Sequence, residues 1–322
     1  MNTDIDLNRR PLVTVLVITY NSSDFVLETL NSTCNQTYKN LELIISDDCS
    51  MDNTLTICDD WLEKNGKFFR NSKLITNPTN TGIPSNCNRG LKHSSGEWIK
   101  IIAGDDAMLP NCIRQNVDFI NSHENIMILF SYANMYLDRF EPKSFIQKYP
   151  SRLNRSFFNP QITANEQYLN LLTGNKIHST VSAFIFREAL INVGGYDERY
   201  KYIEDYPMWL KLTLAGYKLH FMEQVTVNYR RHDKSIHNKT NLQVVHPTFI
   251  KSEELMKEYI YPNVIGLVAI NYKYIYFVSK LIIRLNLNKY SIINKFIYKL
   301  LINYINPLRL IIRLKNILKY IN

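Results

Sequence analysis

The chain has 322 residues, and its 45% hydrophobic and 12% aromatic content supplies enough apolar material for a large core, which excludes a disordered protein. Ten Gly and eleven Pro exclude collagen-like and linker-dominated architectures, and five Cys without a Cys-x-x-Cys pair exclude a disulfide framework or a zinc ribbon. The net charge of +9 is uneven, because no acidic residue follows Glu258 while ten Lys or Arg do. Residues 1 to 258 are therefore nearly neutral, and the terminal segment is basic.

The first hundred residues alternate between strand-like and helix-like segments. Strands are predicted at Val13–Thr19, Leu41–Ser46, Lys73–Thr76 and Trp98–Ala103. Helices are predicted around Phe25–Leu30, at residues 52–64 and at residues 84–93. This alternation predicts an α/β fold with a doubly wound sheet, which binds ligands at the carboxyl ends of its strands.

The second half of the chain is less regular, and residues 133–180 give no clear pattern. A strand is predicted at Val181–Phe186, followed by a turn at Gly194-Gly195. A helix is predicted from Asp205 to about Ala215, because Gly216 is a typical helix-ending residue. From about residue 250 the spacing of apolar and basic residues indicates a mostly helical extension.

Two pairs of adjacent carboxylates follow predicted strands, Asp47-Asp48 and Asp105-Asp106. A solvated turn with a helix cap is the ordinary explanation for one such pair. Two pairs at neighbouring strand ends instead favour a divalent cation that binds a diphosphate. The chain contains neither Gly-x-Gly-x-x-Gly nor a Walker A sequence, so a metal is the expected substitute for a glycine-rich phosphate loop.

Seven motifs follow one another over residues 11 to 235. They are Val13–Asn21, Ile44–Thr54, Asn80-Thr81-Gly82 with Asn88-Arg89-Gly90, Gly96–Ile99, Ala103–Asp106, Gly194–Asp197 and Glu204-Asp205. In this order they resemble the family 2 glycosyltransferases, bacterial enzymes of surface-polysaccharide synthesis. The resemblance implies a GT-A fold, with a doubly wound mixed sheet.

The resemblance implies a nucleotide site formed by residues of the first three motifs. Thr19, Tyr20 and Asn21 are similar to the wall of the uridine site, and Asp48 to the residue that accepts from the uracil N–H. Arg89 is equally compatible with a phosphate contact and with a place on a helix surface.

The resemblance also implies a metal site at Asp105-Asp106. Asp105 is similar to the residue that meets the ribose or the metal, and Asp106 to the residue that binds Mn²⁺ or Mg²⁺. Ala103 departs from the family pattern, which often has Asp there. The stretch Tyr229–His232 is similar to the one that closes the family's donor site, where a His or an Arg reaches the diphosphate or the metal, and His232 is the candidate metal ligand. A surface His beside two solvated Arg is equally compatible with the sequence.

The resemblance implies that Asp205 is the catalytic base, with Glu204 as the second choice, and an N-cap Asp beside a Glu is the alternative. Trp209 and His178 are candidates to line the acceptor site, although an aromatic ring on the inner face of a helix is more often part of the core. The Trp209 region lacks the Gln-x-x-Arg-Trp pattern of processive synthases, which favours single sugar additions.

The resemblance implies an inverting, metal-dependent transfer of a hexose from a UDP-sugar, with glucose as the first choice, to a saccharide on undecaprenyl diphosphate in O-antigen or capsule synthesis. Residues 1–245 would form the catalytic domain, with a nucleotide-binding half over 1–106 and an acceptor half over 107–245. Residues 246–322 would form a basic helical region.

The alternatives are an NAD-dependent dehydrogenase, which the missing glycines disfavour, and a basic module that binds nucleic acid or membrane. The basic tail indicates contact with an anionic membrane surface, with a solvated helical surface as the alternative. Met1–Arg10 does not resemble a secretory signal. Tyr259–Ser279 is too often interrupted to be a clear spanning helix. We expect a cytoplasmic protein that is peripheral on the inner face of the plasma membrane and binds no nucleic acid.

Overall fold

The computed structural model of the chain describes residues 9–177, 179–233, 243–245, 252–307 and 309–311. The chain divides into two units, Met1–Arg231 and His232–Asn322, which are described separately below. The sequence-based division at residues 245 and 246 concerns the extent of the catalytic domain and stays a prediction.

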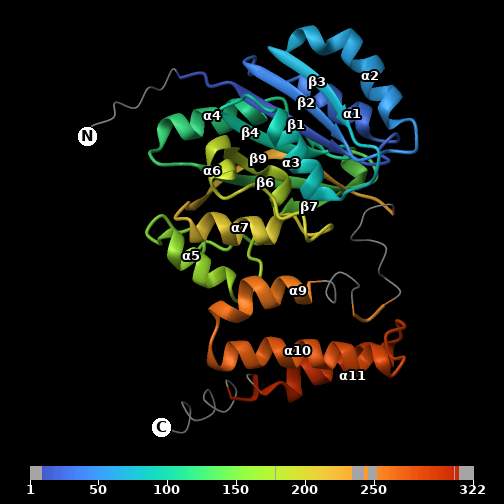
Figure 1. Cartoon of the computed structure of the whole chain (residues 1–322), viewed down its shortest axis with the longest axis vertical. Coiled ribbons are helices and arrows are strands. Elements are labelled where there is room, and N and C mark those ends of the chain that lie inside the picture. Colours follow the sequence, from blue (N-terminus) through green and yellow to red (C-terminus); the bar gives the residue numbers. More distant parts are fainter. Residues whose placement is uncertain (1–8, 178, 234–242, 246–251, 308, 312–322) are drawn as a thin grey trace. The chain divides into compact units, whose positions relative to one another are not determined.

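The predicted alternation of the first hundred residues is confirmed (Figure 1). Four parallel strands have bounds within two residues of those expected: β1 (Val13–Thr19), β2 (Leu41–Asp47), β3 (Asn71–Thr76) and β4 (Trp98–Ala103). The helices between them are α1 (Val26–Cys34), α2 (Thr54–Asn65) and α3 (Ile83–His93).

The side chains of β1 point alternately to the two faces of the sheet, and helices pack against them on both faces. Val13, Val15 and Val17 belong to a core that also contains side chains of α1, α2 and α4 (Cys112–Ser122). On the other face, Gly90 of α3 lies so close to Leu16 that a Cβ at Gly90 would be 2.1 Å from Leu16 Cδ1. Buried apolar runs of this kind fix parallel strands in register, so their carboxyl ends meet at one edge.

The rest of the sheet is mixed, as the family resemblance implies. Within the described residues the strand order is β3-β2-β1-β4-β8-β6-β9-β5, and β7 also pairs with β6. β8 is antiparallel to β4, and β9 is parallel to β6. The bounds are β5 (Ala107–Met108), β6 (Ile128–Leu137), β7 (Phe145–Tyr149), β8 (Phe184–Phe186) and β9 (Leu219–Arg231).

The predicted strand Val181–Phe186 is shorter in the structure, because a 3₁₀ turn occupies Thr180–Ser182. Ser182 Oγ donates to Ser131 O at 2.9 Å and accepts from Ser131 N at 2.9 Å, so its side chain takes the place of backbone pairing. The predicted helix at Asp205 is confirmed as α7 (Asp205–Leu214). It lies beside α5 (Ala164–Leu171), and α6 spans Arg187–Asn192 (Figure 1).

The second unit confirms the expected helical extension over its described residues. Val278 and Ile282 of α10 (Gly266–Arg284) form a small core with Val245, and α11 (Ile292–Leu300) packs against it. By length and composition α10 is the one helix of the described residues that is apolar enough to cross a membrane. The remaining elements are α9 (Glu253–Leu255), 3₁₀ turns at Gly66–Phe68, Pro142–Ser144 and Tyr261–Asn263, and π-helical turns at Met256–Ile260 and Leu301–Ile305.

Candidate active site

The two carboxylate pairs lie on either side of the carboxyl end of β1. Asp48 N–H donates to Thr19 O at 3.0 Å, and Gly104 N–H donates to Ile18 O at 2.9 Å. The approach on the second side is close, since a Cβ at Gly104 would be 2.8 Å from Thr19 Cγ2. The structure therefore brings Asp48 and the Asp105-Asp106 segment together, as the sequence predicts.

The segment from Thr19 to Asn21 is fixed by side-chain hydrogen bonds. Thr19 Oγ1 donates to Asp47 Oδ1 at 2.8 Å, and Asn21 N–H donates to Ser50 Oγ at 2.8 Å. Tyr20 between them is 50% exposed. An exposed aromatic ring on a rigid segment suits a planar base, and the uridine roles of these residues stay predictions.

Asp48 is fully engaged within the protein. Its side chain is 2% exposed and accepts from Thr81 N at 3.0 Å, Gly82 N at 2.7 Å and Arg89 Nη2 at 3.3 Å. Burial alone would raise the pKa of Asp48, but the hydrogen bonds from Thr81, Gly82 and Arg89 outweigh it and lower the pKa. Asp48 thus holds the loop that begins α3. Its predicted bond to uracil stays a prediction.

Arg89 does not lie free on a helix surface. Its guanidinium donates to Thr81 Oγ1 at 2.8 Å and to Asn86 Oδ1 at 2.9 Å, besides Asp48. It therefore braces the loop that Asp48 anchors, and a contact with phosphate stays a prediction.

Asp105 and Asp106 differ in their surroundings. Asp106 is 3% exposed, while Asp105 is half-buried. Burial and the charge of Asp105 hold the pKa of Asp106 well above its ordinary value. A divalent cation would relieve this repulsion, and paired carboxylate oxygens are the ligands that Mn²⁺ and Mg²⁺ prefer.

Among the residues that the structure describes, Asp105 and Asp106 fit a cation whose other ligands do not come from protein side chains. Within the described ranges, no three His, Cys, Asp or Glu side chains are grouped so that they could hold a metal by themselves. The remaining ligands would come from a diphosphate and water. His232 is buried and begins the second unit, and its metal role stays a prediction.

Arg230 was not predicted to support the Asp105-Asp106 loop. Its guanidinium donates to Asp105 O at 2.7 Å, to Asp138 O and to Glu28, and its backbone N–H donates to Asp106 Oδ1 at 2.8 Å. It lies between two rings, 4.7 Å from the Phe25 centroid and 3.9 Å from the Phe140 centroid. The alternative of two solvated arginines is wrong for Arg230, which is 3% exposed because these contacts enclose it.

Glu204 and Asp205 form the second acidic pair, at the start of α7. Asp205 Oδ2 accepts from Asn175 Nδ2 and Thr180 Oγ1, each at 3.2 Å, and Oδ1 accepts from Tyr206 N at 2.6 Å. Burial, and then the charge of Asp205, raises the pKa of Glu204 to about 8, and burial raises the pKa of Asp205. Asp205 is thus oriented by three donors beside a carboxyl group whose pKa is raised.

Lys100 is a further residue that the sequence reasoning missed. It is fully buried in β4, and its Nζ donates to Val181 O at 2.7 Å and to Ala183 O at 3.4 Å. These carbonyls belong to the turn that carries Thr180, a partner of Asp205. A lysine inside the apolar run Trp98–Ile102 was the available signal, because such a charge needs buried partners.

The predicted acceptor residues have different outcomes. Trp209 is 1% exposed and packs edge-on against Phe130, with ring centroids 4.9 Å apart, so the structure places it in the core. That burial matches the alternative left open by the sequence, and an acceptor contact for Trp209 stays an unsupported prediction. His178 lies outside the described residues.

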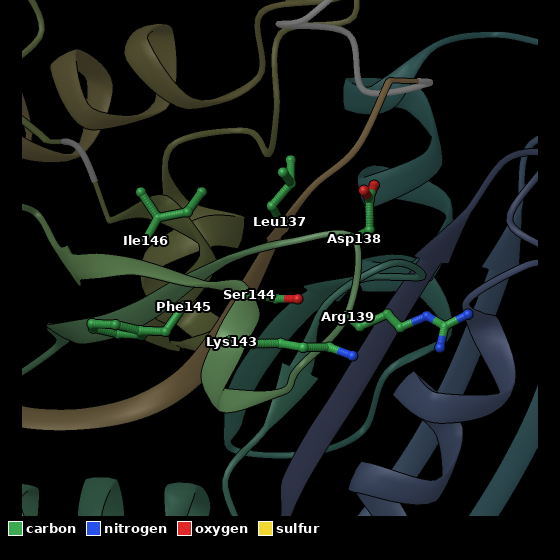
Figure 2. Close-up of a pocket in the computed structure, with 7 residues that line it drawn as sticks. All are labelled: Leu137, Asp138, Arg139, Lys143, Ser144, Phe145 and Ile146. Atoms are coloured by element: carbon green, nitrogen blue, oxygen red, sulfur yellow. The ribbon is translucent and has the colours of Figure 1, made fainter.

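A surface pocket of about 480 Å³ opens on the hairpin between β6 and β7. Figure 2 shows Arg139 and Lys143 extending toward the same side of this pocket. Arg230 ties the hairpin to the Asp105-Asp106 loop, because its guanidinium binds both Asp138 O and Asp105 O. The remaining lining residues are Leu137, Asp138, Ser144, Phe145 and Ile146.

The sequence has relatives among named transferases. A glycosyltransferase of Haemophilus influenzae without an assigned activity is 29% identical over 262 residues, which cover 80% of this chain and 76% of that protein. The Escherichia coli protein named UDP-Glc:alpha-D-GlcNAc-diphosphoundecaprenol beta-1,3-glucosyltransferase WfaP is 27% identical over 229 residues, which cover 70% of this chain and 79% of that one.

Solved structures share the fold. The S. aureus TarS 1-349 structure in complex with UDP-GlcNAc has a TM-score of 0.58 and 20% identity, covering 84% of this chain and 72% of that one. The mannosyltransferase PcManGT from Pyrobaculum calidifontis, in complex with GDP-Man and Mn2+, has a TM-score of 0.51 and 16% identity, covering 95% of this chain and 73% of that one. The match to another TarS 1-349 chain covers 60% of that chain. Because all these identities are below 25%, the likenesses establish the GT-A fold alone.

A comparison of the sequence with models of protein families identifies the family. The model described as glycosyl transferase family 2 matches residues 14–194, which is more than half of the chain. The matched region contains both carboxylate pairs at the end of β1. This match favours a glycosyltransferase over the dehydrogenase and the basic binding module that the sequence left as alternatives. The chain belongs to glycosyltransferase family 2.

Proposed function

We propose that the protein is an inverting, metal-dependent transferase that moves a hexose from a UDP-sugar to a saccharide carried on undecaprenyl diphosphate. Glucose is the first choice for this hexose. The observation that carries this proposal is the placement of Asp48 and Asp105-Asp106 on either side of Thr19, at the end of β1. The activity for which WfaP is named and the UDP-GlcNAc complex of TarS support the donor and acceptor classes.

Asp105 and Asp106 would hold Mn²⁺ or Mg²⁺, which would neutralise the charge that develops on the departing nucleoside diphosphate. Asp105 is the more accessible carboxylate, while Asp106 is buried and hydrogen-bonded to the backbone of Arg230. We therefore expect Asp105 to meet the cation from the solvent side and Asp106 to meet it from the buried side, while the hydrogen bond from Arg230 N–H fixes the position of the Asp106 side chain.

Asp205 would take the proton of the acceptor hydroxyl while that oxygen attacks the anomeric carbon from the side opposite the diphosphate. Its three donors fix the carboxylate in one orientation. Burial and the charge of Asp205 raise the pKa of Glu204, and burial raises the pKa of Asp205, so the two carboxyl groups would share a proton more readily than isolated ones. The three donors that orient Asp205 favour it over Glu204 as the base.

The absence of Gln-x-x-Arg-Trp near Trp209 supports one sugar addition for each acceptor. We propose a role in O-antigen or capsule synthesis, at the inner face of the plasma membrane. The basic residues after Glu258 and the exposed apolar side chains Ile292, Ile293 and Phe296 of α11 support binding to an anionic lipid surface.

A transfer assay tests this function. Purified protein, Mn²⁺ and a synthetic α-GlcNAc diphosphate lipid are incubated with UDP-glucose, UDP-galactose, UDP-GlcNAc or UDP-GalNAc. The masses of the lipid products are measured by mass spectrometry. One donor should yield a product that is one hexose or N-acetylhexosamine heavier. Asp205→Asn should reduce the rate by about 10² or more, whereas Asp60→Asn, an exposed change on α2, should not. An undiminished rate in Asp205→Asn would remove Asp205 as the base.

A further inference from the structure

Two tyrosines meet across strand β6. The rings of Tyr149 and Tyr229 are stacked, with centroids 5.9 Å apart and an interplanar angle of 24°. Tyr149 ends β7, where it pairs with Ala133 of β6, and Tyr229 lies on β9, where it pairs with Met135 of β6. Ala133 pairs with Tyr149 on one side and with Val227 of β9 on the other, so Tyr229 lies two residues along β9 from the position level with Tyr149. Both tyrosines are half-buried.

Tyr229 lies at the Asp105-Asp106 end of this pair. Its neighbour Asn228 pairs with Ala107, and its other neighbour, Arg230, donates its backbone N–H to Asp106. Burial, and then the charges of Asp106 and Asp105, raises the pKa of the Tyr229 hydroxyl, as expected from this proximity.

Tyr149 lies at the Asp205 end. Its partner Ala133 is two residues from Ser131, whose backbone holds the turn that contains Thr180. Thr180 Oγ1 in turn donates to Asp205 at 3.2 Å. Burial, and then the charge of Asp205, raises the pKa of the Tyr149 hydroxyl. The stacked pair therefore spans the interval between the two acidic pairs.

The chemistry of transfer places the hexose in this same interval. The sugar's anomeric carbon is bonded to the diphosphate, which Asp105-Asp106 would hold through a cation, and it must face the hydroxyl that Asp205 activates. The C–H face of a hexose is apolar and packs well on an aromatic ring, while a tyrosine hydroxyl can bond a sugar hydroxyl.

Resting on the proposed function, we propose that Tyr149 and Tyr229 form the wall against which the transferred hexose packs. The uridine and diphosphate would be bound by other residues, at the end of β1 and at the Asp105-Asp106 loop. The tyrosines would therefore contribute to affinity for the sugar of the donor and not to affinity for UDP.

Calorimetric titration in the presence of Mn²⁺ separates these two affinities. The dissociation constants of UDP and of UDP-glucose, UDP-galactose and UDP-GlcNAc are measured for the wild-type protein and for Tyr149→Ala. We expect the UDP constant to stay within about twofold, while the constant for the donor that the wild type binds rises about tenfold. Tyr149→Phe should retain most of the donor affinity, because it keeps the ring.

The matched control is Tyr136→Ala, because Tyr136 is also half-buried but lies on β6 and packs against Phe140 and Phe145. It should leave the ratio of the two constants unchanged. Tyr149→Leu, which keeps apolar volume without a planar face, should give the same loss as Tyr149→Ala and serves if that variant does not fold. A ratio that stays at the wild-type value in both Tyr149→Ala and Tyr149→Leu would overturn the inference. Failure of the wild type to bind any UDP-sugar would instead contradict the proposed function.

Discussion

The backbone N–H of Arg230 donates a 2.8 Å hydrogen bond to Asp106 Oδ1, and the guanidinium of Arg230 donates to Asp105 O at 2.7 Å. One residue of β9 therefore fixes both members of the predicted metal-binding pair. Because Arg230 is 3% exposed, this support comes from a buried charge and is not screened by solvent. Folding stability and metal-dependent nucleotide binding should consequently respond together to changes at this position.

Replacing Arg230 by Met should lower the free energy of unfolding by about 2–4 kcal/mol, because Asp105 O and Asp138 O lose their buried donor. The affinity for UDP in the presence of Mn²⁺ should fall by about tenfold or more as the loop loses its position. Urea unfolding and calorimetry measure the two effects. Arg139→Met is the control, because that side chain is 76% exposed, and similar losses in both variants would contradict the assignment.

Replacing Asp48 by Asn should destabilise the protein by about 1–3 kcal/mol. The change replaces one of the two acceptor oxygens that serve Thr81 N–H and Gly82 N–H by an NH2 donor, and it removes the charge that faces Arg89. Thermal unfolding measures this change. Asp60→Asn on the exposed face of α2 should have no comparable effect. A stable Asp48→Asn protein would show that the loop does not depend on Asp48.

Lys100→Met should lower the turnover number by about tenfold while the KM for the UDP-sugar stays within about twofold. The change removes the donor to Val181 O and Ala183 O and so loosens the turn that presents Thr180 to Asp205. Steady-state kinetics over a range of donor concentrations separates the two constants. Lys73→Met, an exposed lysine on β3, is the matched control. A change confined to KM would exclude a role for Lys100 in positioning the base.

Stability should depend on pH through Glu204. The pKa of Glu204 is raised from 4.5 to about 8 by burial and by Asp205, so the folded protein binds this proton more tightly than the unfolded chain. Its contribution to stability is therefore complete below about pH 4.5 and is lost as the pH rises toward 8. Urea unfolding between pH 5 and pH 9 should show this decline in the wild type.

Glu204→Gln should flatten that part of the profile and become more stable than the wild type at alkaline pH, by an amount of a few kcal/mol at most. Glu188→Gln, at a carboxylate that is 54% exposed, should leave the profile unchanged. Parallel profiles of Glu204→Gln and the wild type would show that Glu204 does not retain a proton in the folded protein.

The first half of the fold was predictable because its interactions are local and regular. Buried β-branched runs such as Val13–Thr19 alternate with short helices, and parallel strands place their ends at one edge. The convergence of Asp48 and Asp105-Asp106 follows directly from that topology. The helix at Asp205 was predictable for a similar reason, since Gly216 ends it with a φ of +90°.

The remaining features depend on pairing between distant segments, which periodicity does not record. β6 pairs with β9 although about ninety residues separate Ile128 from Leu219, and residues 133–180 gave no pattern from which to infer this. The contacts of Arg230 could not be predicted from the sequence, because its partners Asp105, Asp138 and Glu28 are spread along the chain. The stacking of Tyr149 on Tyr229 likewise arises only once β7 and β9 flank β6.

Calorimetric titration of UDP with and without Mn²⁺, in the wild type and in Asp105→Asn and Asp106→Asn, tests most directly whether acidic side chains hold a cation that binds the diphosphate. The account predicts strong binding only when the wild-type protein, UDP and Mn²⁺ are together, and a loss of about tenfold or more in either variant. Equal affinity for UDP in Mn²⁺ and in EDTA, or undiminished Mn²⁺-dependent binding in both variants, would contradict it.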